Sequence, residues 1–189
     1  MQAANINYPH KIRSESEYNE SYQRSVADPK GFWAEIADSF HWHRKWDSVL
    51  DFNFDEPRIE WFKGAKLNIT ENCIDRWAQS HPDKVAILWE PNDPSESHRK
   101  ITYAQLLQEV SNWAKVLKSK GIGKGNRVCL YMPMIPELAF AVLACARIGA
   151  IHSVIFGGFS PASIADRVKD ASAKAIVTAD SVMRGAKKI

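Results

Sequence analysis

The feature that most constrains the fold is an alternation of strand and helix patterns between Asn126 and Asp180. Short apolar segments at 127–132, 150–155 and 175–178 are typical of buried strands, and two helical patterns separate them. Strands that alternate with helices of this length pair in parallel, because each connection crosses the sheet through its helix. We therefore predict an α/β fold with a mostly parallel sheet flanked by helices.

A parallel arrangement gathers the carboxyl ends of the three strands at one edge of the sheet. Three loops would meet there, formed by residues 133–136, residues 156–160 and residues 179–188. Open parallel sheets bind their ligands in the crevice outside the carboxyl ends of the strands. The rest of the chain can therefore be interpreted as support for this edge.

The composition fits a globular protein with a well-filled core. The chain has 189 residues, of which 45% are hydrophobic, so it can fill a core. Its formal net charge of +3 is too small to argue for nucleic acid or a membrane surface as a partner. The N-terminus shows no apolar signal segment, and the apolar stretch 138–156 is interrupted by Arg147 and Gly149. We expect a cytoplasmic protein with reduced cysteines.

The first part of the chain, residues 1–66, is predicted to be an aromatic-rich helical leader that wraps onto a main domain at residues 67–189. Capping patterns at Ser14-Glu-Ser-Glu17 and Asp28-Pro29 predict two helices. Residues 47–66 are expected to be irregular, because acidic and aromatic residues alternate in Asp51-Phe-Asn-Phe-Asp-Glu56 and Pro57 blocks regular structure. The bulky side chains expected to anchor this leader are Phe32, Trp33, Trp42, Trp46 and Trp61.

Two histidines in the leader, His41 and His43, raise the question of a metal site. They lie where the second helix is expected to end, and residues two apart on a helix point to different faces. The sequence offers no evident third ligand. We therefore predict surface packing and no metal site.

Between the leader and the alternating stretch, the sequence predicts a hairpin and a long helix. Residues 85–89 and 99–102 are strand patterns separated by a turn-rich loop, and a capping box at Thr102-Tyr-Ala-Gln105 starts the helix. The glycines of residues 121–125 follow this helix, whereas a dinucleotide-binding fingerprint follows a strand. They are interpreted as a helix end and a tight turn.

The first candidate binding segment is Phe156-Gly-Gly-Phe-Ser-Pro161, which connects a strand to a helix. Ser160 is suited to cap the helix, and Pro161 to begin it. Two glycines allow a ligand to approach the backbone, and the following helix N-terminus favours an anion. A tight turn without a ligand explains the same pattern equally well.

The second candidate binding segment is Arg184-Gly-Ala-Lys-Lys188. Arginine binds phosphate through paired hydrogen bonds and lysine acts as a point charge, whereas composition alone favours a solvated basic turn. The sequence contains no phosphate-binding loop of the Gly-x4-Gly-Lys-Ser/Thr type, no supported Ser-His-Asp arrangement and no metal-ligand cluster. The residues by themselves thus indicate an α/β scaffold for an anionic ligand, without a reaction.

Several blocks of sequence, from about Tyr18 to Ile189, resemble one enzyme family. The chain is similar to the N-terminal part of the AMP-forming acetyl-coenzyme A synthetases, within the adenylate-forming acyl-CoA synthetase superfamily. The blocks that carry the resemblance are Phe32-Trp33, Trp61-Phe62, Leu67-Asn-Ile69, Arg127-Val128 through Tyr131-Met-Pro133, Pro136-Glu137, Ala144-Cys-Ala-Arg-Ile-Gly-Ala150, His152-Ser-Val-Ile-Phe-Gly-Gly-Phe-Ser160, Asp166-Arg167, Asp170, Thr178-Ala-Asp180 and Arg184-Gly185.

The resemblance implies a ligase that works in two steps. ATP and acetate give acetyl-adenylate and diphosphate, and coenzyme A takes the acetyl group after a small C-terminal domain rotates. The residues implied to hold coenzyme A are Arg184, Gly185, Ala186 and Lys187, with Phe156, Gly157 and Gly158 in the loop beside them. Ala186 departs from the family pattern, in which glycine is common.

The resemblance also implies that this chain is less than a third of such an enzyme and is inactive alone. The residues that bind ATP, with its Mg²⁺, and acetate would lie beyond Ile189, so we name no catalytic residue. A propionyl-CoA synthetase and a non-catalytic module that binds coenzyme A or a partner remain as alternatives. Because later strands complete the sheet in this family, the chain alone is expected to self-associate.

Overall fold

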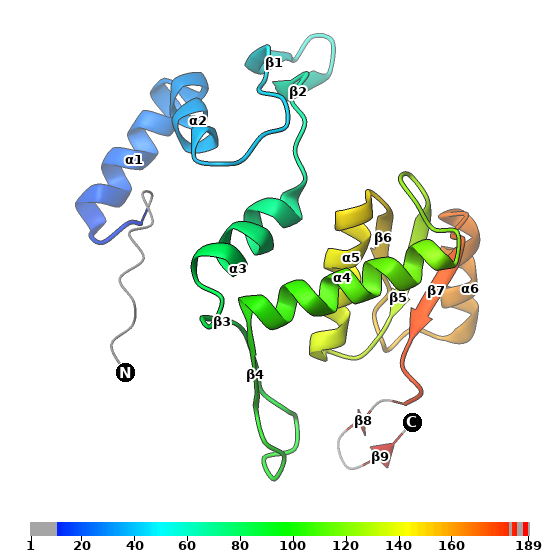
Figure 1. Cartoon of the computed structure of the whole chain (residues 1–189). Helices are drawn as coiled ribbons and strands as arrows, with labels where there is room; N and C mark the ends of the chain where they lie inside the picture. The colour runs from blue at the N-terminus through cyan, green and yellow to red at the C-terminus, as the bar shows by residue number, and fades with distance from the viewer. Residues whose placement is uncertain (1–10, 182, 185–186, 189) are drawn as a thin grey trace. The chain divides into compact units, whose positions relative to one another are not determined.

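The protein is represented by a computed structural model that describes residues 11–181, 183–184 and 187–188. The chain divides after Leu67 into two compact units, which we describe separately (Figure 1). The first unit contains the leader helices and a hairpin, and the second contains the parallel sheet.

Two capped helices open the first unit, as the sequence predicts. Helix α1 (Glu15–Ala27) is capped by the Ser14 hydroxyl, which accepts a hydrogen bond from the Glu17 backbone N–H. Helix α2 (Pro29–Asp38) is capped by the Asp28 carboxylate, which accepts from the Gly31 N–H. Such caps satisfy backbone donors that have no partner within the helix.

The prediction that residues 47–66 are irregular is wrong, because this segment contains an antiparallel hairpin. Strand β1 (Ser48–Asn53) pairs with strand β2 (Arg58–Lys63), with Phe52 opposite Ile59. The alternation of acidic and aromatic residues that suggested irregularity is the two-residue period of a strand. The proline lies in the turn between the strands, where it removes no ladder hydrogen bond.

The aromatic side chains of the first unit pack against one another. The Trp42 ring lies 5.3 Å from that of Trp46 and 5.5 Å from that of Phe62, between ring centroids, and the Trp46 and Phe62 rings are 5.2 Å apart. These are normal distances for tilted and edge-to-face aromatic pairs. The leader therefore has an aromatic cluster of its own, and its predicted wrapping onto the main domain stays a prediction.

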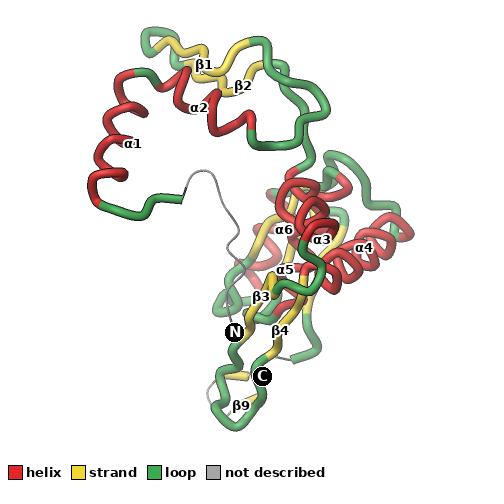
Figure 2. The backbone as a smooth tube through the Cα atoms, turned by 60° about the vertical axis from the view of Figure 1, so that its left-hand side comes forward, coloured by secondary structure: helices red, strands yellow, loops and turns green. Residues whose placement is uncertain are grey.

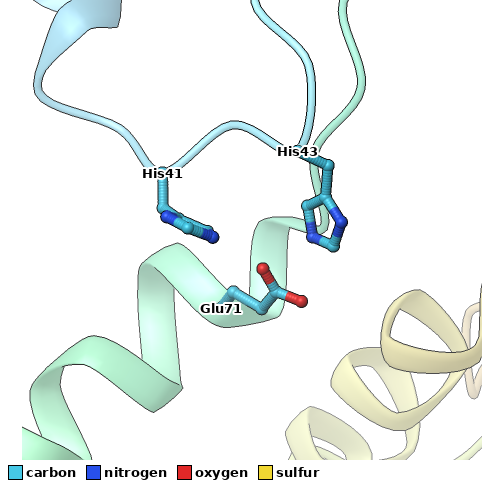
Figure 3. Close-up of side chains that lie close together, drawn as sticks. All are labelled: His41, His43 and Glu71. Atoms are coloured by element: carbon cyan, nitrogen blue, oxygen red, sulfur yellow. The ribbon is translucent and has the colours of Figure 1, made fainter.

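The prediction that His41 and His43 occupy different helix faces is wrong. Helix α2 ends at Asp38, so both histidines lie in the segment after it. Their ring centroids are 5.8 Å apart, and Figure 3 shows the two rings on the same side of the chain. Residues two apart point the same way when the backbone is extended rather than helical. Glu71, also drawn there, belongs to the second unit.

The second unit follows the predicted order of hairpin, long helix and alternating strands. Figure 2 shows its strands with helices gathered around them. Its elements are the π-helix Glu71–Asp75, α3 (Arg76–Ser80), β3 (Val85–Trp89), β4 (Arg99–Thr102), α4 (Tyr103–Ser119), β5 (Arg127–Tyr131), α5 (Pro136–Ile148), β6 (Ile151–Val154), α6 (Pro161–Asp170), β7 (Ala175–Thr178), β8 (Met183–Arg184) and β9 (Lys187–Lys188).

The sheet that organises this unit has three parallel strands in the order β6-β5-β7. Strands β3 and β4 form the predicted antiparallel hairpin, and the capping box at Thr102 and Gln105 starts α4. The predicted α/β class with a parallel sheet is confirmed. The core lies between the sheet and helices α4 and α5, where Val128 and Leu130 of β5 pack with Phe140 and Ala144.

Strand β5 has two different faces because side chains alternate along a strand. Val128 and Leu130 point toward the core with α4 and α5. Arg127, Cys129 and Tyr131 therefore point to the opposite face. There the Arg127 guanidinium donates hydrogen bonds to the carbonyl oxygens of the turn that follows α6, so the end of α6 lies over this second face.

Candidate functional site

A cleft of about 220 Å³ opens at the carboxyl ends of β5 and β7. Three segments line it: residues 131–133, which end β5 and begin the next loop, Gly157 in the loop after β6, and residues 178–181 at the end of β7. This is the sheet edge at which the sequence predicts a ligand. Three strands of one direction bring these segments together, although they are distant along the chain.

The glycine turn after β6 leaves its backbone accessible to a ligand. A Cβ atom placed on Gly157 would meet no other heavy atom within 4 Å, whereas one on Gly158 would come within 2.6 Å of the Phe156 ring. The Ser160 hydroxyl accepts a hydrogen bond from the Ser163 N–H, and Pro161 begins α6, as predicted. The turn therefore places exposed glycines a few residues before a helix N-terminus, and helix N-termini favour anions.

Aromatic rings and a cation flank the glycine turn. The Phe156 side chain is 72% exposed and meets the Phe159 ring edge to face at 5.8 Å between centroids. The Arg167 guanidinium of α6 lies 4.3 Å from the centroid of the Phe159 ring, within the range of a cation–π interaction. The sequence analysis assigned no role to this contact, in which Arg167 lies nearly two helical turns after the start of α6.

The loop after β5 is braced by the β3–β4 hairpin. The Trp89 indole N–H donates to the Met134 carbonyl oxygen at 2.9 Å. Arg99 of β4 forms an ion pair with Glu137 at 2.9 Å and lies over the Trp89 ring. These contacts fix the loop that follows β5, which forms one wall of the cleft. The Trp89–Met134 pair is 45 residues apart in the sequence and the Arg99–Glu137 pair is 38 residues apart. No sequence pattern indicates such pairs.

The basic segment continues from the cleft wall formed by residues 178–181. Strands β8 and β9 pair antiparallel, with the backbones of Arg184 and Lys187 opposite each other. Gly185, Ala186 and the side chains of Arg184 and Lys187 lie outside the described part of the structure. Their predicted role in binding coenzyme A therefore stays a prediction.

Four residues with polar side chains line the cleft. The Asp180 carboxylate and the hydroxyls of Tyr131, Thr178 and Ser181 belong to residues that line it. The Tyr131 hydroxyl donates a hydrogen bond to the Gly157 carbonyl oxygen at 3.1 Å, a contact that the sequence analysis missed. Along the described residues, no helix is at once long enough and apolar enough to cross a lipid bilayer.

The parallel sheet, its strand-end cleft and the glycine turn define an α/β ligand-binding domain. Residues 74–189 match the family described as "AMP-binding enzyme", and residues 18–73 match "Acetyl-coenzyme A synthetase N-terminus". The first match covers more than half of the sequence. The chain therefore belongs to the AMP-binding enzyme family, and the resemblance found in the sequence is confirmed.

Individual relatives agree with this family membership. A curated acetyl-coenzyme A synthetase from Magnetococcus marinus is 54% identical over 93% of this chain, which spans 27% of that protein. One from Saccharophagus degradans is 50% identical over 91% of this chain, again 27% of the relative. The solved structure of the acetoacetyl-CoA synthetase from Streptomyces lividans matches 96% of this chain with a TM-score of 0.82 and 27% identity, and 28% of that chain is covered.

Proposed function

We propose that this chain forms the N-terminal part of an AMP-forming acetate–CoA ligase. The observation that carries the proposal is its 54% and 50% identity, over more than 90% of its length, to relatives named acetyl-coenzyme A synthetase. In this reaction ATP and acetate give acetyl-adenylate and diphosphate, and the coenzyme A thiol then displaces AMP. Because the chain spans 27% of those relatives, the whole reaction is a proposal for the complete gene product.

We assign to this chain a part of the coenzyme A site. The exposed turn at Gly157 and the N-terminus of α6 suit polar and anionic groups. A cleft of about 220 Å³ can hold only part of so large a ligand. The Asp180 carboxylate on its wall repels phosphate, so we place an uncharged part of the ligand there. The phosphates belong with the positive charges of Arg184 and Lys187.

We assign no described residue to ATP, Mg²⁺ or acetate, and we name no catalytic residue. The contribution of this chain is therefore to bind and orient the coenzyme A that accepts the acetyl group. Orientation of one reactant in this way lowers the barrier of the transfer step without any proton or bond rearrangement in the chain itself.

A double variant of the complete gene product, Arg184→Ala with Lys187→Ala, tests this assignment. We expect coenzyme A binding to weaken by about 1–3 kcal/mol, because charge-assisted hydrogen bonds to phosphate are lost. Acetate-dependent adenylation should change little. The matched control removes two exposed lysines of α4, Lys115 and Lys118. An equal loss of adenylation and thioester formation in the double variant would contradict the assignment.

The experiment that tests the proposed reaction is acetate-dependent exchange between ATP and diphosphate. It is run on the complete gene product and on the 189-residue chain, with propionate and acetoacetate as competing acids. Exchange by the complete product that is fastest with acetate supports the acetate ligase. Preference for propionate would favour the propionyl-CoA synthetase. Absence of exchange, together with coenzyme A binding by the chain in a calorimetric titration, would favour the non-catalytic module.

We also propose that the 189-residue chain associates with itself when it is produced alone. Among the described strands, β6 and β7 each have one neighbour, and they expose Ile151 (54%), Val154 (53%) and Ile176 (50%). Unpaired strand edges with exposed apolar side chains favour pairing with another chain. Light scattering at micromolar concentration should show species larger than a monomer, and Ile151→Lys on β6 should reduce them. A monodisperse monomer would contradict this proposal.

A further inference from the structure

The Tyr131 side chain connects two walls of the strand-end cleft. Tyr131 is the last residue of β5, and its hydroxyl donates to the carbonyl oxygen of Gly157, in the loop that follows β6, at 3.1 Å. Both residues line the cleft. The hydrogen bond therefore joins the central strand of the sheet to the glycine turn at the point where a ligand would enter.

This bond begins where the backbone ladder ends. The last register pair between β5 and β6 joins Leu130 to Val154, and the Ile155 N–H donates to the Leu130 carbonyl oxygen at 2.9 Å. Beyond Ile155 the chain leaves the ladder. The Tyr131 hydroxyl then attaches the loop to β5 again, two residues further along.

The loop segment that Tyr131 contacts contains Gly157 and Gly158, and without such contacts it would adopt many conformations. Two adjacent glycines have the largest range of backbone conformations of any residue pair, and they lose the most freedom when they are ordered. A turn that is already ordered does not have to lose that freedom when a ligand binds. A single hydrogen bond to the first glycine therefore affects ligand affinity more than the stability of the sheet.

We propose that Tyr131 is a positioning residue that holds the turn at residues 156–159 in the conformation that receives coenzyme A. The proposal rests on the proposed function, since it assigns a purpose to the same cleft. Tyr131 acts on the ligand through Gly157, whose outward side is open space. The hydroxyl that holds the turn is therefore expected to affect coenzyme A binding and not the formation of acetyl-adenylate.

The test is Tyr131→Phe in the complete gene product, which removes the hydroxyl and keeps the ring. Tyr103→Phe at the start of α4 is the matched control, because it makes the same chemical change outside the cleft. Three quantities are measured: amide hydrogen exchange across residues 156–160 without ligand, the Kd for coenzyme A by calorimetry, and the rate of acetate-dependent ATP–diphosphate exchange.

Tyr131→Phe should accelerate amide exchange in the turn. It should raise the Kd for coenzyme A by about three- to tenfold, the effect of one neutral hydrogen bond, and leave the adenylation rate unchanged. Tyr103→Phe should change none of the three. Unchanged amide exchange in Tyr131→Phe would overturn the proposal, because the turn would then not depend on the hydroxyl. Faster amide exchange with an unchanged Kd would also overturn it.

The same measurements separate this proposal from the proposed function. A wild-type protein that neither binds coenzyme A nor catalyses exchange would refute the proposed function, and with it the purpose assigned to Tyr131. A wild-type protein that does both, with equal losses of adenylation and coenzyme A binding in Tyr131→Phe, would refute only the positioning role. That pattern would show a general effect on the fold.

Discussion

The two faces of strand β5 are built for different tasks. On one face Val128 and Leu130 are completely buried among the apolar residues of α4 and α5. On the other face Arg127 and Tyr131 direct polar groups to backbone carbonyl oxygens on either side of α6. The first face contributes to stability by burying apolar surface. The second face fixes the positions of the loops before and after α6.

This difference separates stability from position. Burial of apolar surface is non-directional and scales with area, so it tolerates small displacements. Hydrogen bonds are directional, and they fix a group to a few tenths of an ångström. We therefore expect substitutions on the core face to change the free energy of unfolding, and substitutions at the carboxyl end of the other face to change ligand binding.

The largest effect is expected from Leu130→Ala on the core face. The side chain is completely buried, so its truncation loses burial and leaves a cavity, and we expect a loss of about 2–5 kcal/mol in the free energy of unfolding. Urea unfolding followed by circular dichroism measures it. Leu88→Ala is the control, because Leu88 is 62% exposed and should cost less than about 0.5 kcal/mol. Equal losses in the two variants would break the comparison.

The next largest effect is a pH dependence of the free energy of unfolding, which arises from Cys145 on the core side of the sheet. Burial raises the pKa of the Cys145 thiol on α5 from 9.0 to about 11. Burial disfavours the charged thiolate. The folded protein therefore keeps the Cys145 proton at pH values where the unfolded chain has lost it. Stability from this group is complete below pH 9 and is lost as the pH rises toward 11, by about 2–3 kcal/mol.

The comparison that isolates this effect uses Cys145→Ala. The difference in unfolding free energy between the wild-type protein and the variant should be constant from pH 7 to 8.5 and should shrink, or reverse, by pH 11. Burial also raises the pKa values of Cys73 and Cys129, but these thiols are present in both proteins and cancel. A difference independent of pH would contradict the prediction.

A smaller loss is expected at the amino end of the second face, from Arg127→Ala. The Arg127 guanidinium donates to the carbonyl oxygens of Ala171 at 2.7 Å, Ser172 at 3.2 Å and Gly125 at 3.3 Å. Ser172 has a positive φ of 46°, which is unfavourable for a residue with a side chain. We expect the protein to lose about 1–3 kcal/mol of stability, measured by urea unfolding. Coenzyme A affinity should be unaffected, which a calorimetric titration checks in the complete gene product.

Most of the sheet could be predicted because its signals are local. The helix between the first two parallel strands, the strand at 175–178 and the cap at Ser160 were each indicated by neighbouring residues, and each lies where the sequence places it. The hairpin at 48–63 was missed because its alternation of acidic and aromatic residues was interpreted as irregular. The alternation has the two-residue period of a β-strand, and this signal was present in the sequence. The proline does not prevent the hairpin, because it lies in the turn.

The candidate site was predictable in position but not in its internal contacts. The rule that ligands bind at the carboxyl ends of parallel strands predicted the edge of the sheet where the cleft lies. The glycines at 157 and 158 predicted one of the segments that line it. The Tyr131–Gly157 bond spans 26 residues and the Trp89–Met134 bond spans 45. Such pairs depend on how strands and helices pack in three dimensions, and no periodicity in a single sequence reports them.

The smallest change in stability, and the sharpest test of the comparison, is expected from Tyr131→Phe. Its hydrogen bond lies at an exposed strand end, so its loss should lower the free energy of unfolding by less than about 1 kcal/mol. Arg127→Ala, on the same face of the same strand, should lower stability more and affect coenzyme A less. If both variants lost stability and affinity in the same proportion, the second face would act as one structural unit. If the effects separate as expected, the carboxyl end of β5 serves the ligand and its amino end serves the fold.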